Sequence, residues 1–134
     1  MADPILNDLF DVVWLAGLAE GEATFDLHRG RYPRIRIAMT DRDVVGRAAT
    51  LMGTRVRVTF RPKPYMAMWH AEASGDKAAE IMRALLPHMG SRRSAKIAEV
   101  LGAYDLRDPE APRRIPGPAL TRPPGLPMSP EGAR

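Results

Sequence analysis

A chain of 134 residues is long enough for one modest hydrophobic core and too short for two, so a single domain is expected. Its 45% hydrophobic and 27% charged residues are typical of a globular protein. No apolar run reaches the roughly 18 residues that span a bilayer, and the acidic N-terminus lacks the basic region of a secretory signal. The sequence contains no cysteine, which excludes disulfides and thiolate metal sites and makes a cytoplasmic location the default expectation.

Charge is segregated along the chain, although the net charge is only +4. Residues 1–23 contain five acidic and no basic side chains, whereas residues 24–73 contain ten Lys or Arg against four Asp or Glu. Nearly all of these basic residues are arginine, whose planar guanidinium suits bidentate contact with phosphates and guanine edges. A polyanionic partner is therefore predicted.

The first predicted element is a broadly apolar helix over about residues 8–21, too apolar to lie on a water-exposed surface. Small residues gather in its second half: Ala16, Gly17 and Gly21. Two features break local rules, because glycine lowers helix propensity and because Glu20 and Glu22 stand near the end where the helix dipole disfavours negative charge. A segment that breaks such rules without a local gain is a candidate functional site.

Two segments with period-two alternation follow, "ATFDLHRG" and "YPRIRIAM", and they predict a hairpin. Its apolar face carries Phe25, Leu27, Ile35, Ile37 and Met39. Its polar face carries Thr24, Asp26, His28, Arg34 and Arg36. A helix is predicted next, which starts at Thr40 and Asp43 in a pattern close to a capping box and ends at Gly53.

The pattern then repeats in "RVRVTFRPK" and "YMAMWHAEA", which predict a second hairpin. The first strand is expected to place five polar side chains on one face: Arg55, Arg57, Thr59, Arg61 and Lys63. Val56, Val58 and Phe60 are expected on the other face. In the second strand, Trp69, Ala71 and Ala73 alternate with His70 and Glu72. Helical spacing predicts two last helices, one that ends before Pro87 and one that starts near Ser91 and runs through Leu101.

These elements predict an α+β fold of order αββαββαα, with one four-stranded antiparallel sheet and helices on a single face. The domain is expected over residues 1–104. Residues 105–134 contain eight prolines and few large apolar side chains, which predicts a tail that is disordered or only loosely attached. The open face of the sheet must then meet water or a partner.

An arginine-rich antiparallel sheet with one open face suits duplex DNA, because two-stranded ribbons fit the major groove of B-DNA. A face that met only water would more often mix in acidic side chains and so avoid a field of one sign. Asp26, His28, His70 and Glu72 are candidates for base contacts, although a residue of this kind, taken alone, is more often an ordinary surface residue. The predicted DNA-binding residues are Thr24, Asp26, His28, Arg34, Arg36, Arg55, Arg57, Thr59, Arg61, Lys63 and His70.

The segment "LAGLAEGEA", Leu15 to Ala23, resembles the motif of the LAGLIDADG homing endonuclease family, with acidic residues at both positions where the family has them. The order and polarity of the elements extend this resemblance over roughly residues 8–102. In that family, motif helices of two domains pack at a shared axis. The resemblance therefore implies a dimer interface in which small residues let two backbones approach. The implied interface residues are Ala16, Gly17, Glu20 and Gly21. One copy of the motif implies a homodimer and a pseudo-palindromic site.

The resemblance also implies a catalytic site. Glu22 matches the metal-binding carboxylate of the family, and two such residues, one per subunit, would hold Mg²⁺ beneath the DNA. Arg92, or Arg93 as an alternative, matches a basic residue that stabilises phosphate charge. Met39 aligns with a polar residue, commonly glutamine, that positions metal-bound water, and a thioether cannot replace an amide in that role. Ala23 replaces the final glycine of the motif.

Three functions stay open at this point. The leading hypothesis is a homodimeric, Mg²⁺-dependent endonuclease that cuts both strands of a long specific DNA site. The departures at Ala23 and Met39 favour a non-cleaving DNA-binding protein or transcriptional regulator on the same scaffold, whereas the retention of Glu22 favours cleavage. An RNA-binding maturase would use the same sheet, but the narrow major groove of A-form RNA suits a β-ribbon less well.

Overall fold

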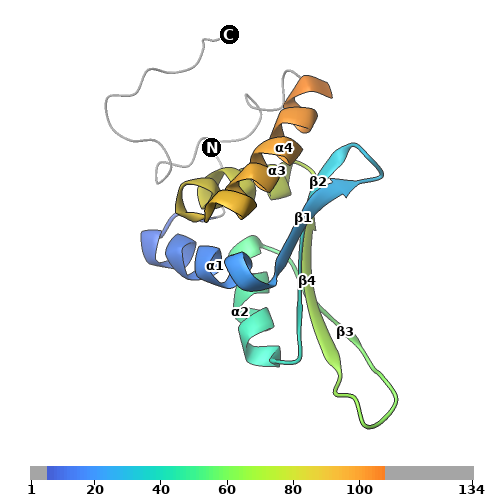
Figure 1. Ribbon diagram of the computed structural model, residues 1–134. Coiled ribbons are helices and arrows are strands. Elements are labelled where there is room, and N and C mark those ends of the chain that lie inside the picture. The colour runs from blue at the N-terminus through green and yellow to red at the C-terminus, as the bar shows by residue number, and fades with distance from the viewer. Residues whose placement is uncertain (1–5, 108–134) are drawn as a thin grey trace.

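The computed structural model describes residues 6–107, and its element order confirms the predicted αββαββαα pattern. Figure 1 shows a single sheet with the helices gathered against one of its faces. The four strands are β1 (Ala23–His28), β2 (Tyr32–Met39), β3 (Val56–Thr59) and β4 (Met68–Ser74). They lie in the order β1-β2-β4-β3, and each neighbouring pair is antiparallel. No helix within residues 6–107 has the length and apolar character that crossing a membrane requires.

The helices are α1 (Leu9–Glu22), α2 (Arg42–Met52), α3 (Asp76–Leu85) and α4 (Ser91–Arg107), with the short 3-10 helix η1 (Leu86–His88) before α4. Asp8 caps the start of α1, because its side chain accepts a hydrogen bond from Phe10 N at 2.9 Å. Gly53 ends α2 at φ 68°, as predicted. The predicted capping box of α2 is wrong, because Asp41 is the cap residue and its side chain makes no cap hydrogen bond.

The core lies between the helices and the inner face of the sheet. Phe25 of β1 and Ile35 and Ile37 of β2 are at most 2% exposed, as their alternation predicts. Val12 and Leu15 of α1 are fully buried in the same core. Burial of one such side chain contributes about 1.5–3 kcal/mol. Because this packing fixes which side of each strand faces inward, it also fixes which side chains stand on the open face.

The edge strand β3 is shorter than predicted. It ends at Thr59, so Arg61 and Lys63 lie in the turn between β3 and β4 and not on a strand. The turn contains two prolines, which lack the N–H group that a ladder needs. Phe60 is 79% exposed instead of packing under the helices. Figure 1 shows that this hairpin projects beyond α2, so its tip has no helix over it.

The last helix is longer than predicted. α4 continues to Arg107, with Tyr104 buried and a carboxylate oxygen of Asp105 at 2.7 Å from Arg83 Nη2 of α3. Residues 105–107 therefore belong to the folded body. The rest of the predicted tail, residues 108–134, lies outside the described residues.

Candidate functional site on the open face of the sheet

Polar side chains occupy the face of the sheet that the helices leave open. The strand register places Thr24 beside Arg36 and places Asp26 beside Arg34, and β4 continues the row with Glu72 beside Arg36. The open face carries Thr24, Asp26, His28, Arg34, Arg36, Ala38, Arg57, Thr59, His70 and Glu72. The structure therefore brings most of the predicted DNA-binding residues onto one surface.

Three predicted DNA-binding residues do not lie on this face. Arg55 precedes β3 and lines a hollow beside α2, together with Trp69. Arg61 folds back within the turn, where its Nε donates to Met66 O at 2.7 Å, and Lys63 follows it in the same turn. The prediction failed because it extended the alternation of β3 beyond both ends of the strand.

The open face is consequently less basic than predicted. Within the strands, Arg34, Arg36 and Arg57 share it with Asp26 and Glu72. Further positive charge lies at the β1 edge, where Arg92 and Lys96 of α4 line a second open hollow with Thr24.

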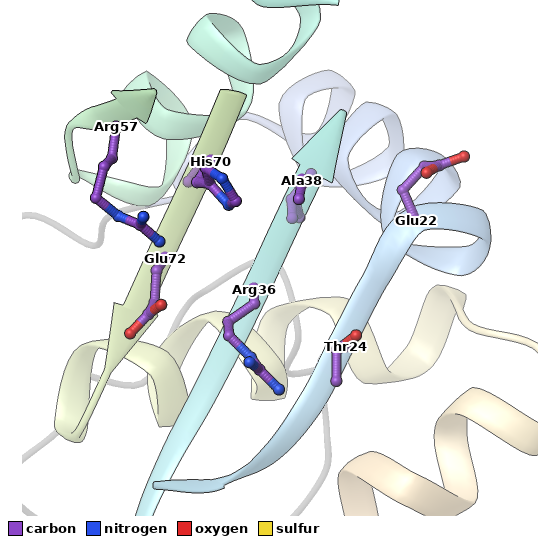
Figure 2. A pocket seen from close by; sticks show the side chains of 9 residues that line it. Glu22, Thr24, Arg36, Ala38, Arg57, His70 and Glu72 are labelled. Carbon is purple, nitrogen blue, oxygen red and sulfur yellow. The ribbon is translucent and has the colours of Figure 1, made fainter. Parts of the chain in front are cut away.

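Glu22, the last residue of α1, stands at the margin of the open face. It borders an open hollow of about 440 Å³, and Figure 2 shows Glu22 at one side of this hollow with Arg57 and Glu72 across β2 and β4. The other labelled lining residues are Thr24, Arg36, Ala38 and His70. Glu22 is exposed, and its carboxylate makes no hydrogen bond or ion pair with any residue that the structure describes. This carboxylate is available to a ligand.

Mg²⁺ in proteins is held by one or two carboxylates together with substrate phosphates. Across residues 6–107, no group of three or more His, Asp or Glu side chains is arranged to hold a metal ion. The exposed carboxylate of Glu22 therefore fits a site that a second carboxylate and a phosphate complete. It does not fit a metal centre that one chain holds alone.

A hydrogen-bonded cluster occupies the β1–β2 part of the open face. Asp26 Oδ1 accepts from Arg34 Nε at 2.9 Å, and Asp26 Oδ2 accepts from Arg34 Nη2 at 3.0 Å and from Arg36 Nη2 at 2.8 Å. Arg34 Nη1 lies 2.9 Å from His28 Nδ1. The hydrogen bond from Arg34 is the main cause that lowers the pKa of Asp26, and the same bond raises the pKa of Arg34. Both groups are therefore charged at neutral pH.

His70 lies on β4, opposite Arg57 of β3 and Ala38 of β2. Its Nε2 is 3.0 Å from Thr59 Oγ1. Burial, assisted by the positive charge of Arg57, lowers the pKa of His70 below its ordinary 6.5. The imidazole is therefore neutral at pH 7 and acts there as a hydrogen-bonding group without charge.

Glu20 and Arg93 connect the end of α1 to the start of α4. Gly90 N donates to Glu20 Oε1 at 2.8 Å, which places the carboxylate at the helix end whose dipole favours negative charge. Arg93 donates through Nε to Glu20 O at 3.0 Å and through Nη1 to Ala23 O. These carbonyls have no partner within α1. The unfavourable position of Glu20 in its own helix therefore has a tertiary explanation, which sequence analysis missed because Gly90 is distant in the chain.

Arg92 differs from Arg93 in its surroundings. It is exposed and makes no hydrogen bond or ion pair to any described residue, whereas Arg93 is committed to α1. Of the two arginines between which the resemblance left a choice, Arg92 alone has a guanidinium that is free for a phosphate.

The assignment of Met39 to the catalytic site does not fit the structure. Met39 is partly buried and packs against the hydrophobic core, because it shares the inner face of β2 with Ile35 and Ile37. Ala38 is the side chain at this end of β2 on the open face, as Figure 2 shows. A methyl group, and not a thioether, therefore stands near Glu22.

Ala16, which was predicted at a dimer interface, is only 2% exposed and packs within the core of its own chain. Gly17 and Gly21 behave differently. A methyl group on either Cα would meet no neighbouring element within 4 Å, so both glycines face open space. Phe10, 83% exposed, and Val13, 50% exposed, extend this uncovered stripe along α1.

Comparisons with known proteins give a match in structure only. No family model and no curated protein matches the sequence. Two solved structures of the homing endonuclease I-CvuI match, one in complex with the I-CreI target (C1221) in 2 mM Mg with the DNA not cleaved, the other in complex with its target (Sro1.3) in 2 mM Ca. Each match has a TM-score of 0.51 at 16% identity and covers 80% of this chain and 78% of that chain. The chain therefore shares the fold of a homing endonuclease, which supports its resemblance to the LAGLIDADG family at the level of the fold.

Proposed function

We propose that this chain is a homodimeric, Mg²⁺-dependent endonuclease that binds duplex DNA across the open face of its sheet and cleaves both strands. The observation that carries the proposal is the position of Glu22, a free carboxylate at the end of α1 on the margin of a face that bears Arg36 and Arg57. The fold shared with a homing endonuclease solved on DNA supports the proposal.

The basic side chains have distinct roles in this proposal. Arg36 and Arg57 stand on the open face of the antiparallel sheet, and strands of this kind fit a DNA groove. Arg92 and Lys96 flank the β1 edge, where a phosphate backbone that leaves the sheet would pass. Arg92 would also stabilise the charge that develops on the scissile phosphate. Binding is expected to weaken steeply with salt, because each phosphate contact releases counterions.

Cleavage of both strands would use a second copy of the chain, because each scissile phosphate needs a metal-binding carboxylate and each chain places one, Glu22, at the end of α1. Glu22 of each subunit, together with phosphate oxygens of the substrate, would hold Mg²⁺. When bound, Mg²⁺ supplies charge neutralisation at the phosphate and lowers the pKa of a coordinated water. Glu22 would supply the negative charge that holds the ion, and the small side chain of Ala38 would leave room for water.

The exposed stripe on α1 is the surface that we assign to the dimer. Exposed apolar side chains on a helix mark an interaction surface, and Gly17 and Gly21 allow two backbones to approach closely. Gly17→Glu is expected to convert the dimer into a monomer without harm to the fold of one chain. Gly102→Glu in α4 is the matched control, because Gly102 also faces open space in a helix. Sedimentation analysis measures the mass of each variant in solution. If Gly17→Glu and Gly102→Glu sedimented with the same mass, this interface would be contradicted.

A non-cleaving DNA-binding protein is the second candidate. Ala38 favours it, because the last β2 side chain on the open face is a methyl group, which cannot orient an attacking water. The binding surface would be the same in this case, and only the chemistry would differ.

One experiment separates the two candidates. Purified protein is incubated in Mg²⁺ and in Ca²⁺ with a DNA library that contains the uninterrupted form of the genomic region that flanks the gene. Glu22→Gln is compared with Asp43→Asn, a control at an exposed position of α2. Staggered cuts at one site in Mg²⁺, lost in Glu22→Gln and kept in Asp43→Asn, are expected. Specific retention of DNA without cuts in either ion supports the DNA-binding protein. Cuts that persist in Glu22→Gln contradict the proposed mechanism, and a preference for structured RNA over duplex DNA contradicts both candidates.

A further inference from the structure

A carboxylate, Asp26 of the edge strand β1, stands on the face that we propose for DNA. An unpaired carboxylate there would repel phosphates, but Asp26 is paired three times, twice with Arg34 and once with Arg36. The side chain of Arg34 is only 19% exposed and that of Asp26 is 28% exposed. The two contacts between them form the parallel, bidentate geometry of a strong arginine–carboxylate pair. Asp26 therefore fixes the orientation of Arg34.

The remaining partners of the cluster are fixed as well. Arg34 Nη1 lies 2.9 Å from His28 Nδ1, and a guanidinium has no acceptor. Nδ1 must accept this hydrogen bond, so the ring proton of His28 is on Nε2. Arg36 donates to Asp26 only through Nη2, and its side chain is 45% exposed. With Asp26 engaged by both arginines, the polar groups that the cluster offers outward are predominantly N–H donors.

We propose that Asp26 is a specificity-determining residue, which fixes Arg34, Arg36 and His28 as an array of donors for a guanine base in the major groove. Guanine presents the acceptors N7 and O6 at that edge, whereas adenine and cytosine present an amino donor and thymine presents a methyl group. An array of donors matches guanine best. The inference rests on the proposed binding of duplex DNA and adds to it the base that is selected and the residue that selects it.

The fixed geometry has an energetic consequence. An arginine that is free in solution loses rotamer freedom when it contacts a base, and prior pairing with a carboxylate removes part of this entropy cost. The same carboxylate lowers the positive charge of the face, which weakens attraction to phosphates of any sequence. Loss of Asp26 should therefore change the two kinds of binding in opposite directions: general affinity for DNA rises while discrimination between bases falls.

The test is selection of binding sites by the full-length chain from a randomised duplex library. Wild-type protein is compared with Asp26→Asn and with the control Glu72→Gln. Glu72 lies opposite Arg36 in the register, and its side chain makes no hydrogen bond to any described residue. The control therefore removes one negative charge from the same face and leaves every hydrogen bond of the cluster in place. A bidentate arginine contact discriminates by about 1–3 kcal/mol, so the wild type should favour guanine about 5- to 150-fold at the contacted position.

Asp26→Asn should bind mixed-sequence duplex more tightly and lose most of this guanine preference, whereas Glu72→Gln should bind more tightly and keep it. Arg34→Lys retains the charge without the bidentate geometry, so it should lose the guanine preference too. If Asp26→Asn and Arg34→Lys keep the guanine preference of the wild type, the inference is overturned. A wild-type binding site without guanine also overturns it. The proposed binding of duplex DNA stands in both cases. A wild type that enriches no duplex sequence overturns the proposed function, and the inference with it.

Discussion

Gly90 N donates a hydrogen bond of 2.8 Å to Oε1 of Glu20, and this contact joins the start of α4 to the end of α1. Arg93 of α4 reaches the same end of α1 through the carbonyl oxygens of Glu20 and Ala23. Glu22 lies between these two carbonyl groups in the chain, so its position on the open face depends on α4. The end of the motif helix is therefore held by tertiary contacts and not by its own local sequence.

Glu20→Ala is expected to destabilise the fold. The substitution removes the acceptor of Gly90 N and the negative charge at the start of α4, and the loss of such a cap costs about 1 kcal/mol. Glu99→Ala is the control, because Glu99 is exposed and forms only a pair with Lys96 within α4, which is expected to change stability by less than about 0.5 kcal/mol. Chemical denaturation measures both values, and equal losses would show that the contact with Gly90 contributes nothing.

Arg93 and Arg92 are adjacent in α4, and their substitution by alanine is expected to affect different properties of the protein. Arg93→Ala removes two hydrogen bonds from a charged donor to backbone carbonyls, so it should lower the free energy of unfolding by about 1.5–3 kcal/mol. Arg92→Ala removes an exposed side chain and should leave stability within about 0.5 kcal/mol of wild type. In the proposed function, Arg92→Ala reduces DNA binding or cleavage instead. Thermal denaturation and DNA affinity, measured on both proteins, separate the roles, and a stability loss at Arg92 would refute this assignment.

The two residues at the end of β2 make a further matched pair. Met39→Gln places an amide in the partly buried inner face, and burial of a polar group without a partner costs about 1–3 kcal/mol. Ala38→Gln places the same amide on the open face, where water solvates it, so stability should stay within about 0.5 kcal/mol of wild type. Denaturant midpoints test the difference. If Met39→Gln were the better tolerated change, the orientation of β2 would have to be reversed.

The sequence predicted the fold class and the face of most strand residues, because period-two alternation directly determines which side chains enter the core. Ile35 and Ile37 lie where this rule places them, and Gly53 ends its helix as the cap rule predicts. The rule also places Met39 with Ile35 on the inner face. The catalytic role suggested for Met39 by family resemblance conflicted with that pattern, and the packing follows the pattern.

Other features were beyond prediction because they depend on contacts between distant parts of the chain. The partner of Glu20 is in another helix, so the sequence showed an unfavourable charge without its compensation. The pairing of Asp26 with Arg34 and Arg36 depends on the register of two strands, and composition alone suggested free arginines. The length of β3 is a different case: the strand ends at Thr59, before the two prolines of the following turn, and the prediction passed this end because it followed the alternation alone.

The stability of the fold should depend on the protonation of His70. Burial lowers the pKa of His70 in the folded state below 6.5, so below that pH the unfolded chain binds a proton that the folded chain does not. The stability that the neutral imidazole contributes is present above pH 6.5 and is lost as the pH falls through the folded-state pKa. Between about pH 7.5 and about pH 5.5, the melting temperature of wild type should therefore fall more than that of His70→Asn. His88→Asn, a change at an exposed position in η1, should keep the wild-type pH dependence, and equal slopes for wild type and His70→Asn would exclude His70 as the cause.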